Sequence, residues 1–147
     1  MLDDRRLIKM VTETAQMLSS ALSEHNAIPF YKRTHANHPC SKWVGKSRQN
    51  FIWAIELLME LNLEYVRRYN KKVDHLAYTK AFDTCIEQID KIPDGKLTPF
   101  VNCSLFKDES DIISAYRKTM MQKWTEFKLV PTWTDATPPN WITSHLT

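Results

Sequence analysis

Glycine is scarce in this chain, with two residues in 147. This scarcity argues against a glycine-rich phosphate-binding loop and against an all-β fold built on tight turns. Cys40, Cys85 and Cys103 are an odd number of cysteines without paired spacing, so a disulfide framework is not expected and a reducing, intracellular setting fits better. No apolar run approaches the length of a membrane span, and the charged start "MLDDRR" differs from a signal peptide. We therefore expect a cytoplasmic protein without membrane association.

The composition is that of one ordinary globular domain. Hydrophobic residues make up 43% and charged residues 25% of the chain. A length of 147 residues allows one real core and is too short for two. We therefore expect a single helical domain over residues 1–147.

The first half of the chain carries two helical patterns. A first helix is expected from Asp3 or Asp4 to Ser23, because acidic residues suit a helix N-terminus. Ser47 is a plausible cap for a second helix that reaches about Tyr69. The apolar stripe of the first helix consists of Leu7, Val11, Leu18 and Leu22. That of the second consists of Phe51, Ile55, Leu58, Asn62 and Tyr65 or Val66. The opposite face of the second helix carries Glu56, Glu60 and Glu64.

The second half predicts two more helices, giving an all-α fold of about four helices. Asp74 is the expected cap of the third, which "IPDG" follows with turn chemistry. The fourth is expected to start near Asp108 or Ser110 after a loop at 96–107. The Pro-rich, aromatic tail "LVPTWTDATPPNW" is expected to be extended and packed against the body. The inward residues are expected to be Ala77, Ala81, Cys85 and Ile89 in the third helix, and Ile112, Tyr116, Met120 and Trp124 in the fourth.

Residues 25–46 are expected to form a long, irregular, basic loop. Between positions 31 and 50 there are five Lys or Arg residues, two His and no carboxylate, and a second basic group, "RRYNKK", spans 67–72. Such clusters suit phosphates, although solvated loops and helix ends are the plainer alternative. Trp43 either stacks on a base or packs in the core, and neither alternative is favoured. The candidate DNA-binding residues are Lys32, Arg33, His35, His38, Lys42, Trp43, Lys46 and Arg48.

Three polar residues, Lys9, Glu13 and Gln16, share one face of the first expected helix within "KMVTETAQ". In the plainer interpretation, Lys9 and Glu13 form an exposed ion pair that stabilises the helix by about 0.3–0.5 kcal/mol. In the functional one they are catalytic. A carboxylate stabilises the positive charge that develops on a sugar when an N-glycosidic bond breaks. An amine adds to C1′ and forms a Schiff base.

The sequence does not predict a metal centre, and no cofactor is expected. "HANHPC" supplies His35, His38 and Cys40, but no further ligand stands at matching spacing. The alternative for His38-Pro39 is a rigid turn whose imidazole bonds a backbone carbonyl. A cysteine nucleophile is not favoured either, and Cys85 is expected in the core.

Several segments, taken in order, resemble the pyrimidine-dimer DNA glycosylases of the phage endonuclease V type and related phage proteins. "LDDRRLIKMVTETAQML" is similar to the family's first helix, and "YKRTHANHPCSKWV" with "NFIWAIELLMELNLEYVRRYN" is similar to its basic loop and long second helix. "IPDG" and "VPTW" resemble late features. The resemblance implies a compact all-α protein that binds duplex DNA and flips a base out of the stack. It places Glu13 where the family keeps its catalytic glutamate.

One departure from the family concerns the nucleophile. In the family this is an α-amino group at a processed N-terminus that precedes the first helix, whereas the present sequence enters that helix directly. Leu2 is bulky, so we expect Met1 to be retained and to carry the terminal amine. Three alternatives remain: the start lies upstream, Lys9 replaces the amine, or the activity is lost.

The sequence therefore favours a DNA-binding protein of the pyrimidine-dimer glycosylase type, with base excision and linked AP-lyase activity as the chemistry that the resemblance implies. Its expected partner is duplex DNA, and its location is the host cytoplasm if a phage encodes it. The rival hypothesis is a non-catalytic phage protein that binds nucleic acid, a nucleotide or a host protein on the same scaffold. A glycosylase-like enzyme for a modified base or a free nucleotide is a third.

Overall fold

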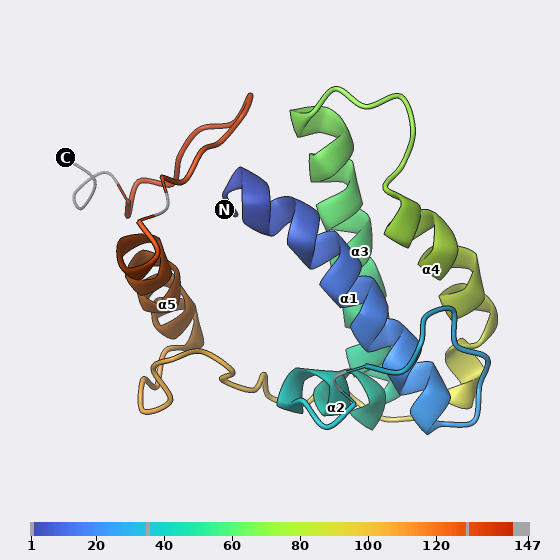
Figure 1. Ribbon diagram of the computed structural model, residues 1–147. Coiled ribbons are helices and arrows are strands. Elements are labelled where there is room, and N and C mark those ends of the chain that lie inside the picture. The colour runs from blue at the N-terminus through green and yellow to red at the C-terminus, as the bar shows by residue number, and fades with distance from the viewer. Residues whose placement is uncertain (1, 35, 129, 143–147) are drawn as a thin grey trace.

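The computed structural model describes residues 2–34, 36–128 and 130–142, and over these ranges the protein consists of helices and connecting segments without a strand. The predicted all-α fold is confirmed. One α-helix more than expected is present among the described residues (Figure 1). The elements are α1 (Asp4–Glu24), α2 (Pro39–Lys46), α3 (Arg48–Arg68), α4 (Leu76–Glu87), the short 3-10 helix η1 (Ile89–Lys91) and α5 (Ile112–Glu126). No helix in this part of the chain is long and apolar enough to cross a membrane.

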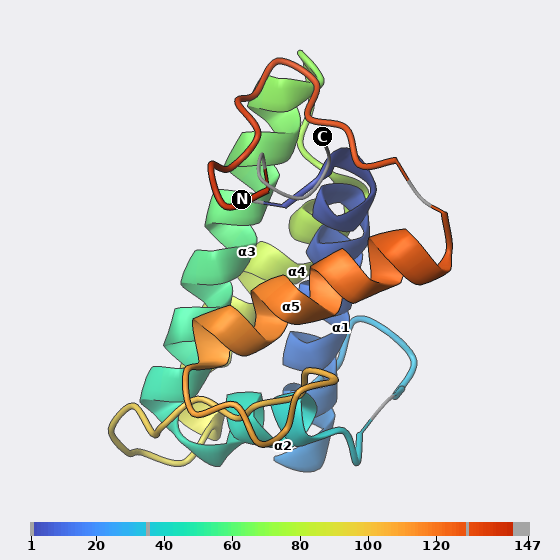
Figure 2. The ribbon, with the colours of Figure 1, turned by 90° about the vertical axis from the view of Figure 1, so that its left-hand side faces the viewer.

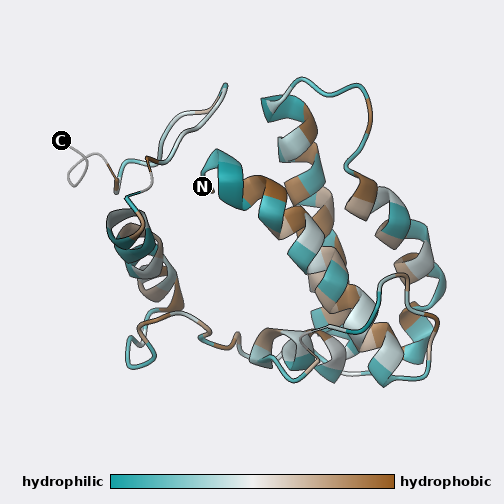
Figure 3. Ribbon diagram, viewed as in Figure 1, coloured by the Kyte–Doolittle hydropathy of each residue, from teal (hydrophilic) through white to brown (hydrophobic). Residues whose placement is uncertain are grey.

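Helix α1 is central to the fold because it packs against α2, α3 and α4. Its predicted apolar stripe is confirmed, since Leu7, Val11, Leu18 and Leu22 are all buried. Figure 3 shows hydrophobic residues along α1 and α3 alternating with hydrophilic ones, the pattern of helices that bury one face and expose the other. Burying one face of α1 leaves its other face available for Glu13 and its neighbours.

Helices α3 and α4 complete the main core around α1. Ser47 caps α3 as predicted, with its hydroxyl accepting from the Asn50 N–H at 3.1 Å. The cap expected at Asp74 is wrong: α4 is capped by His75, whose Nδ1 accepts from the Ala77 N–H at 3.0 Å. Asp74 instead accepts from the side-chain amide of Asn62. The small buried residues Ala77, Ala81 and Cys85 then face the core.

Helix α2 corrects the expectation of an irregular segment throughout 25–46. Pro39 stands in the first turn of this helix, where its missing N–H costs no hydrogen bond and its fixed φ suits a helix. His38 supplies the cap, with Nδ1 accepting from the Cys40 N–H at 3.1 Å. The imidazole therefore accepts a backbone N–H, whereas the expected turn had it bonding a carbonyl. Among the described residues, the irregular segment between α1 and α2 is confined to 25–34 and 36–38.

Helix α5 crosses in front of α1 and α3 in Figure 2, and in Figure 1 its ribbon stands apart from the other helices. It begins after a cap at Asp111, slightly later than the expected start. Buried Trp124 fastens it to the start of α1, since the indole N–H donates to Asp3 Oδ2 at 3.0 Å and Arg6 lies over the ring. Beyond α5, the described part of the tail is non-helical, as predicted.

A buried charge cluster around Asp4 joins α1, α3 and the C-terminal tail. Arg68, which is 1% exposed, donates to Asp4 Oδ1 at 3.3 Å and to Glu64 Oε1 at 2.8 Å. Asp4 Oδ2 accepts from the hydroxyls of Thr132 at 2.8 Å and Thr134 at 2.7 Å. Glu64, expected on an open face, is thus a partner of a buried arginine. Because buried charges are tolerated only with partners, this cluster fixes three segments together.

We predict that Asp4→Asn lowers the free energy of unfolding by about 3 kcal/mol at neutral pH. This is the lower end of the cost of breaking a buried ion pair, because Glu64 still pairs with Arg68. Burial pushes the pKa of Asp4 up, but hydrogen bonds from Thr134 and Thr132 and the Arg68 charge hold it below 3.8. A lowered folded-state pKa gives stability that is present above the unfolded pKa and is lost as pH falls through the folded value.

Urea unfolding at pH 7 and near pH 3 measures this effect, with exposed Asp83→Asn as the control. The difference in free energy of unfolding between the native protein and the Asp4→Asn variant should shrink as the pH falls below 3.8. An equal difference at both pH values would contradict the role of the Asp4 carboxylate.

Candidate functional site

A small cleft opens beside the polar face of α1. Its volume is about 190 Å³, and it is lined by Glu13, Gln16 and Met17 of α1, Thr34 and His38 of the loop, and Ser41 of α2. The predicted residues Glu13 and His38 therefore meet at one site although 25 positions separate them. The cleft combines a carboxylate, an amide, an imidazole and two hydroxyls, a set able to bind a small polar ring.

Lys9 lies one helical turn before Glu13, and its Nζ is 3.3 Å from Glu13 Oε1. The two side chains are 68% and 43% exposed, so the pair is open to water and adds little to stability. Lys9 is not among the residues that line the cleft. The plainer interpretation thus describes Lys9 well, while Glu13 takes part in the ion pair and also lines the cleft.

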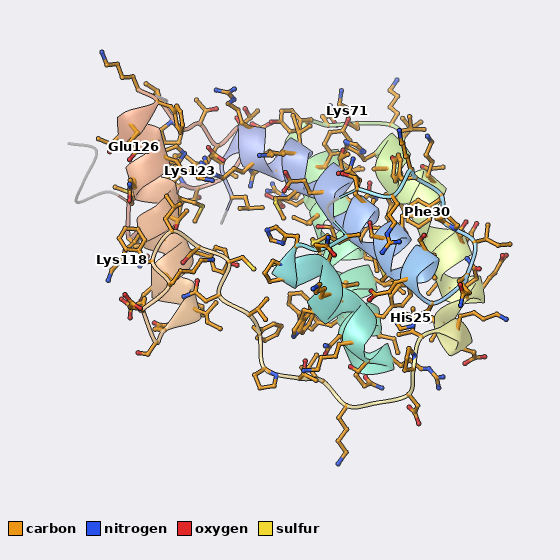
Figure 4. All side chains as sticks on the ribbon, turned by 60° about the horizontal axis from the view of Figure 1, so that its bottom comes forward. His25, Phe30, Lys71, Lys118, Lys123 and Glu126 are labelled. Carbon is orange, nitrogen blue, oxygen red and sulfur yellow. The ribbon has the colours of Figure 1, made fainter. Side chains whose placement is uncertain are left out.

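Two serines of α1 hold the loop that covers this face. Ser19 Oγ accepts from the N–H groups of Phe30 at 3.0 Å and Tyr31 at 2.9 Å. Ser20 Oγ donates to the Thr34 carbonyl at 2.9 Å. Figure 4 shows Phe30 on the loop beside α1 and His25 at the end of that helix. The position of Thr34 in the cleft therefore depends on hydrogen bonds to buried α1 hydroxyls.

The hydroxyl of Ser41 has no hydrogen-bond partner among the described residues, although the residue is only 2% exposed. Buried hydroxyls usually have a partner, because losing water without a replacement costs about 1–3 kcal/mol. Since Ser41 also lines the cleft, a ligand there can supply that partner. Thr14, fully buried on α1, likewise has an unpartnered hydroxyl within the described chain.

The loop and α2 bring exposed basic residues to the surroundings of the cleft. Lys32 and Arg33 directly precede Thr34, and Lys42 directly follows Ser41. Lys46 lies one turn further along α2, on the same helical face as Lys42. All four are exposed, and none forms an ion pair with a described residue. This arrangement leaves four cationic groups available to an anionic partner.

Trp43 and Arg48 are used within the fold. Trp43 is 6% exposed, its indole N–H donates to the Pro99 carbonyl at 2.9 Å, and Trp53 and Phe100 pack on it. Core packing is therefore its role, and stacking on a base is not available in this conformation. The Arg48 guanidinium donates to the carbonyls of Asp90 in η1 and of Ile92, the residue after η1. We omit both from the candidate interface; His35 and Met1 lie outside the described residues.

A second cluster lies next to the cleft and was missed by the sequence analysis. Cys40 Sγ lies 2.8 Å from Cys103 Sγ, and one ring nitrogen of His38 is within 4.8 Å of both sulfurs. Cys103 lies within the loop predicted at 96–107 and is 63 positions from Cys40, a separation at which spacing carries no signal. Cys85 is buried in the core as expected, and burial raises the pKa of its thiol to about 12.

A larger and more open hollow of about 490 Å³ lies along α5. It is lined by Phe106, Ser114, Arg117, Lys118, Met121 and Trp141. This set lacks a carboxylate, and the predicted catalytic and DNA-binding residues are not part of it. The smaller cleft at Glu13 is therefore the better candidate for chemistry.

Comparison with known proteins adds no relative to this account. No family model matches the chain, and neither curated proteins nor solved structures give a match. The case for a function therefore depends on the cleft and its surroundings.

We predict that Ser19→Ala loosens the loop over the cleft, because it leaves the Phe30 and Tyr31 N–H groups without their acceptor. Hydrogen exchange of these two amides should accelerate about tenfold or more, as expected for the loss of about 1–3 kcal/mol, while α3 keeps its protection. Ser23→Ala, on the same helix, is the control. Unchanged exchange at both amides would contradict the tether.

Proposed function

We propose that this protein binds duplex DNA and acts as a DNA glycosylase of the pyrimidine-dimer type, with Glu13 as its catalytic carboxylate. The observation that carries the proposal is the position of Glu13 in a cleft framed by a basic loop and α2. The resemblance of the first helix to that family agrees with this position. We further propose that the protein works in the cytoplasm, that of the host if a phage encodes it.

The proposed phosphate contacts come from Lys32, Arg33, Lys42 and Lys46. These side chains are exposed and without ion-pair partners in the described structure, so binding DNA does not require breaking an existing pair. Exposed His38 belongs to the same surface. Cations that neutralise phosphates release condensed counterions, which gives affinity without base specificity.

The cleft suits one flipped base or its sugar. Its volume of about 190 Å³ is below the ~300–1,000 Å³ of typical small-molecule pockets, so a whole dinucleotide does not fit. Gln16 and Ser41 offer hydrogen bonds to the edge of a ring. Enzymes that act on a base within a duplex extrude a nucleotide into such a pocket.

In the proposed reaction, the Glu13 carboxylate stabilises positive charge on the sugar while the N-glycosidic bond breaks. The electron pair of that bond leaves with the base, which takes up a proton. A neutral amine then bonds to C1′, the C1′–O4′ bond opens as O4′ takes up a proton from the amine, and an imine remains at C1′. Loss of a proton from C2′ then expels the 3′ phosphate by β-elimination and cuts the strand. Lys9 is the candidate amine because it is adjacent to Glu13, and it must lose a proton before it can attack.

The alternative is a non-catalytic protein that binds nucleic acid, a nucleotide or a host protein on this scaffold. The exposed ion pair of Lys9, outside the cleft lining, favours it because a charged amine is not a nucleophile. An enzyme for a modified base or free nucleotide is a further variant of the same cleft chemistry.

Borohydride trapping on an abasic or UV-irradiated duplex tests the enzymatic proposal. We predict a covalent protein–DNA adduct and strand cleavage on either substrate. On the UV-irradiated duplex, where the N-glycosidic bond must break first, Glu13→Gln should lower both by at least about 100-fold, as for removal of a group that stabilises transition-state charge. Glu87→Gln, which changes an exposed residue of α4, is the matched control. Lys9→Arg keeps the ion pair and removes the candidate amine, with Lys72→Arg as its control. Folded protein without an adduct or cleavage would overturn the proposal of catalysis.

Glu13→Gln separates the enzyme from the binder, because the enzyme loses its turnover. A binder retains its affinity in Glu13→Gln and never forms the adduct. In both cases the logarithm of the binding constant should fall steeply with the logarithm of salt concentration, and replacing one of the four cations by alanine should lower the slope by about 0.9. A flat salt response would instead direct attention to a protein partner.

A further inference from the structure

We propose that His38, Cys40 and Cys103 form a binding site for a thiophilic divalent cation, with Zn²⁺ as the best fit. The proposal goes beyond DNA binding and does not depend on it, because Glu13, Lys9 and the four proposed phosphate-binding cations are not among the ligands. His38 is the one ligand that also lines the cleft. Three potential ligand atoms, two thiol sulfurs and an imidazole nitrogen, lie within 4.8 Å of one another. They come from three separate places in the fold: the last residue before α2, its first turn, and the loop before α5.

The donor set selects the metal class. Two thiolates and an imidazole suit Zn²⁺ and other soft or borderline cations, whereas Mg²⁺ and Ca²⁺ prefer oxygen ligands. Three protein ligands leave a fourth position for water or another ligand, as in open zinc sites. Exposed His38 lies on the solvent side, while Cys40 and Cys103 are half-buried.

The distances require only a small adjustment. Tetrahedral sulfur ligands about 2.3 Å from zinc lie about 3.8 Å apart, so the two thiols must separate by about 1 Å from their present 2.8 Å. His38 Nδ1 uses its lone pair for the Cys40 N–H, so the ring must release that bond or turn to coordinate a metal. Because the side chain is exposed, such a rotation meets no packed neighbour on the solvent side.

Proton release accompanies binding. Burial and, to a smaller extent, the hydrogen bond to Cys103 raise the pKa of Cys40 to about 12, against the lowering effects of Tyr116 and Lys107. The Cys40 thiol is therefore protonated at neutral pH. Coordination breaks the S–H bond, leaves the electron pair on sulfur for the metal and transfers the proton to solvent, so affinity must rise with pH.

The site would also fasten the C-terminal half of the chain. Cys103 N–H donates to the Tyr116 hydroxyl at 3.0 Å, so the cysteine already contacts α5. A metal shared by Cys40 and Cys103 would join the segment before α5 to α2. This link would lie near the start of α5, whereas Trp124 holds the helix near its end. Metal binding is therefore expected to stabilise the position of α5 as well as the cluster.

Titration of the full, reduced chain with ZnCl₂ under anaerobic conditions tests the site. We expect one saturable equivalent of zinc, bound more tightly as pH rises, and a thiolate-to-metal absorption band when Co²⁺ replaces it. Cys40→Ser and Cys103→Ser should each lose this binding, and His38→Ala should weaken it. Cys85→Ala is the matched control, because it removes a cysteine from the core and leaves the cluster intact.

Should a cysteine variant fail to fold by circular dichroism, alkylation of the native chain replaces it. Zinc should then protect Cys40 and Cys103 from the reagent, as read by mass spectrometry of the peptides. Binding of zinc by folded Cys103→Ser at native strength would overturn the proposal. Failure of the reduced native protein to bind zinc would also overturn it. This holds even if a mild oxidant readily joins the two cysteines as a disulfide.

Discussion

The buried contact between Arg68 and Asp4 is the constraint on which the arrangement of this protein depends. Arg68 is 1% exposed, and a charge so deeply buried requires negative partners. Therefore α1, α3 and the tail must meet at Asp4 and Glu64. Asp3, the residue before Asp4, accepts a hydrogen bond from the indole N–H of Trp124. One end of α1 thereby becomes the point at which the helical core and the C-terminal half are joined.

The middle and far end of α1 set the candidate site. Once the first turn is fixed and the apolar face is buried, Glu13 can only face the other side, where the loop lies. Ser19 and Ser20 bind that loop through backbone atoms, so its basic residues follow the helix that carries Glu13. Fold and proposed function are therefore linked through one helix, which supplies the core stripe, the loop anchors and the carboxylate.

Local patterns in the sequence predicted much of the fold, because helix periodicity and the Ser47 cap involve neighbouring residues. The position of Glu13 on an open face of α1 followed from the same spacing. Helix α2 was missed since its proline looked like a loop signal, although proline also suits a first helical turn. The pairing of Cys103 with Cys40, and the choice between core packing and base stacking for Trp43, could not be predicted, because both depend on contacts with segments more than 50 positions away.

Chemical-shift mapping by NMR, with a duplex that carries one uncleavable abasic-site analogue, tests the central claim most directly. The claim is that DNA is bound by the basic loop and α2 with the lesion at the Glu13 cleft. The account predicts that the amide signals of Gln16, Thr34 and Ser41 shift on titration, and more strongly than with an undamaged duplex. Shifts confined to the α5 surface around Arg117 and Trp141, with the cleft signals unchanged, would contradict it.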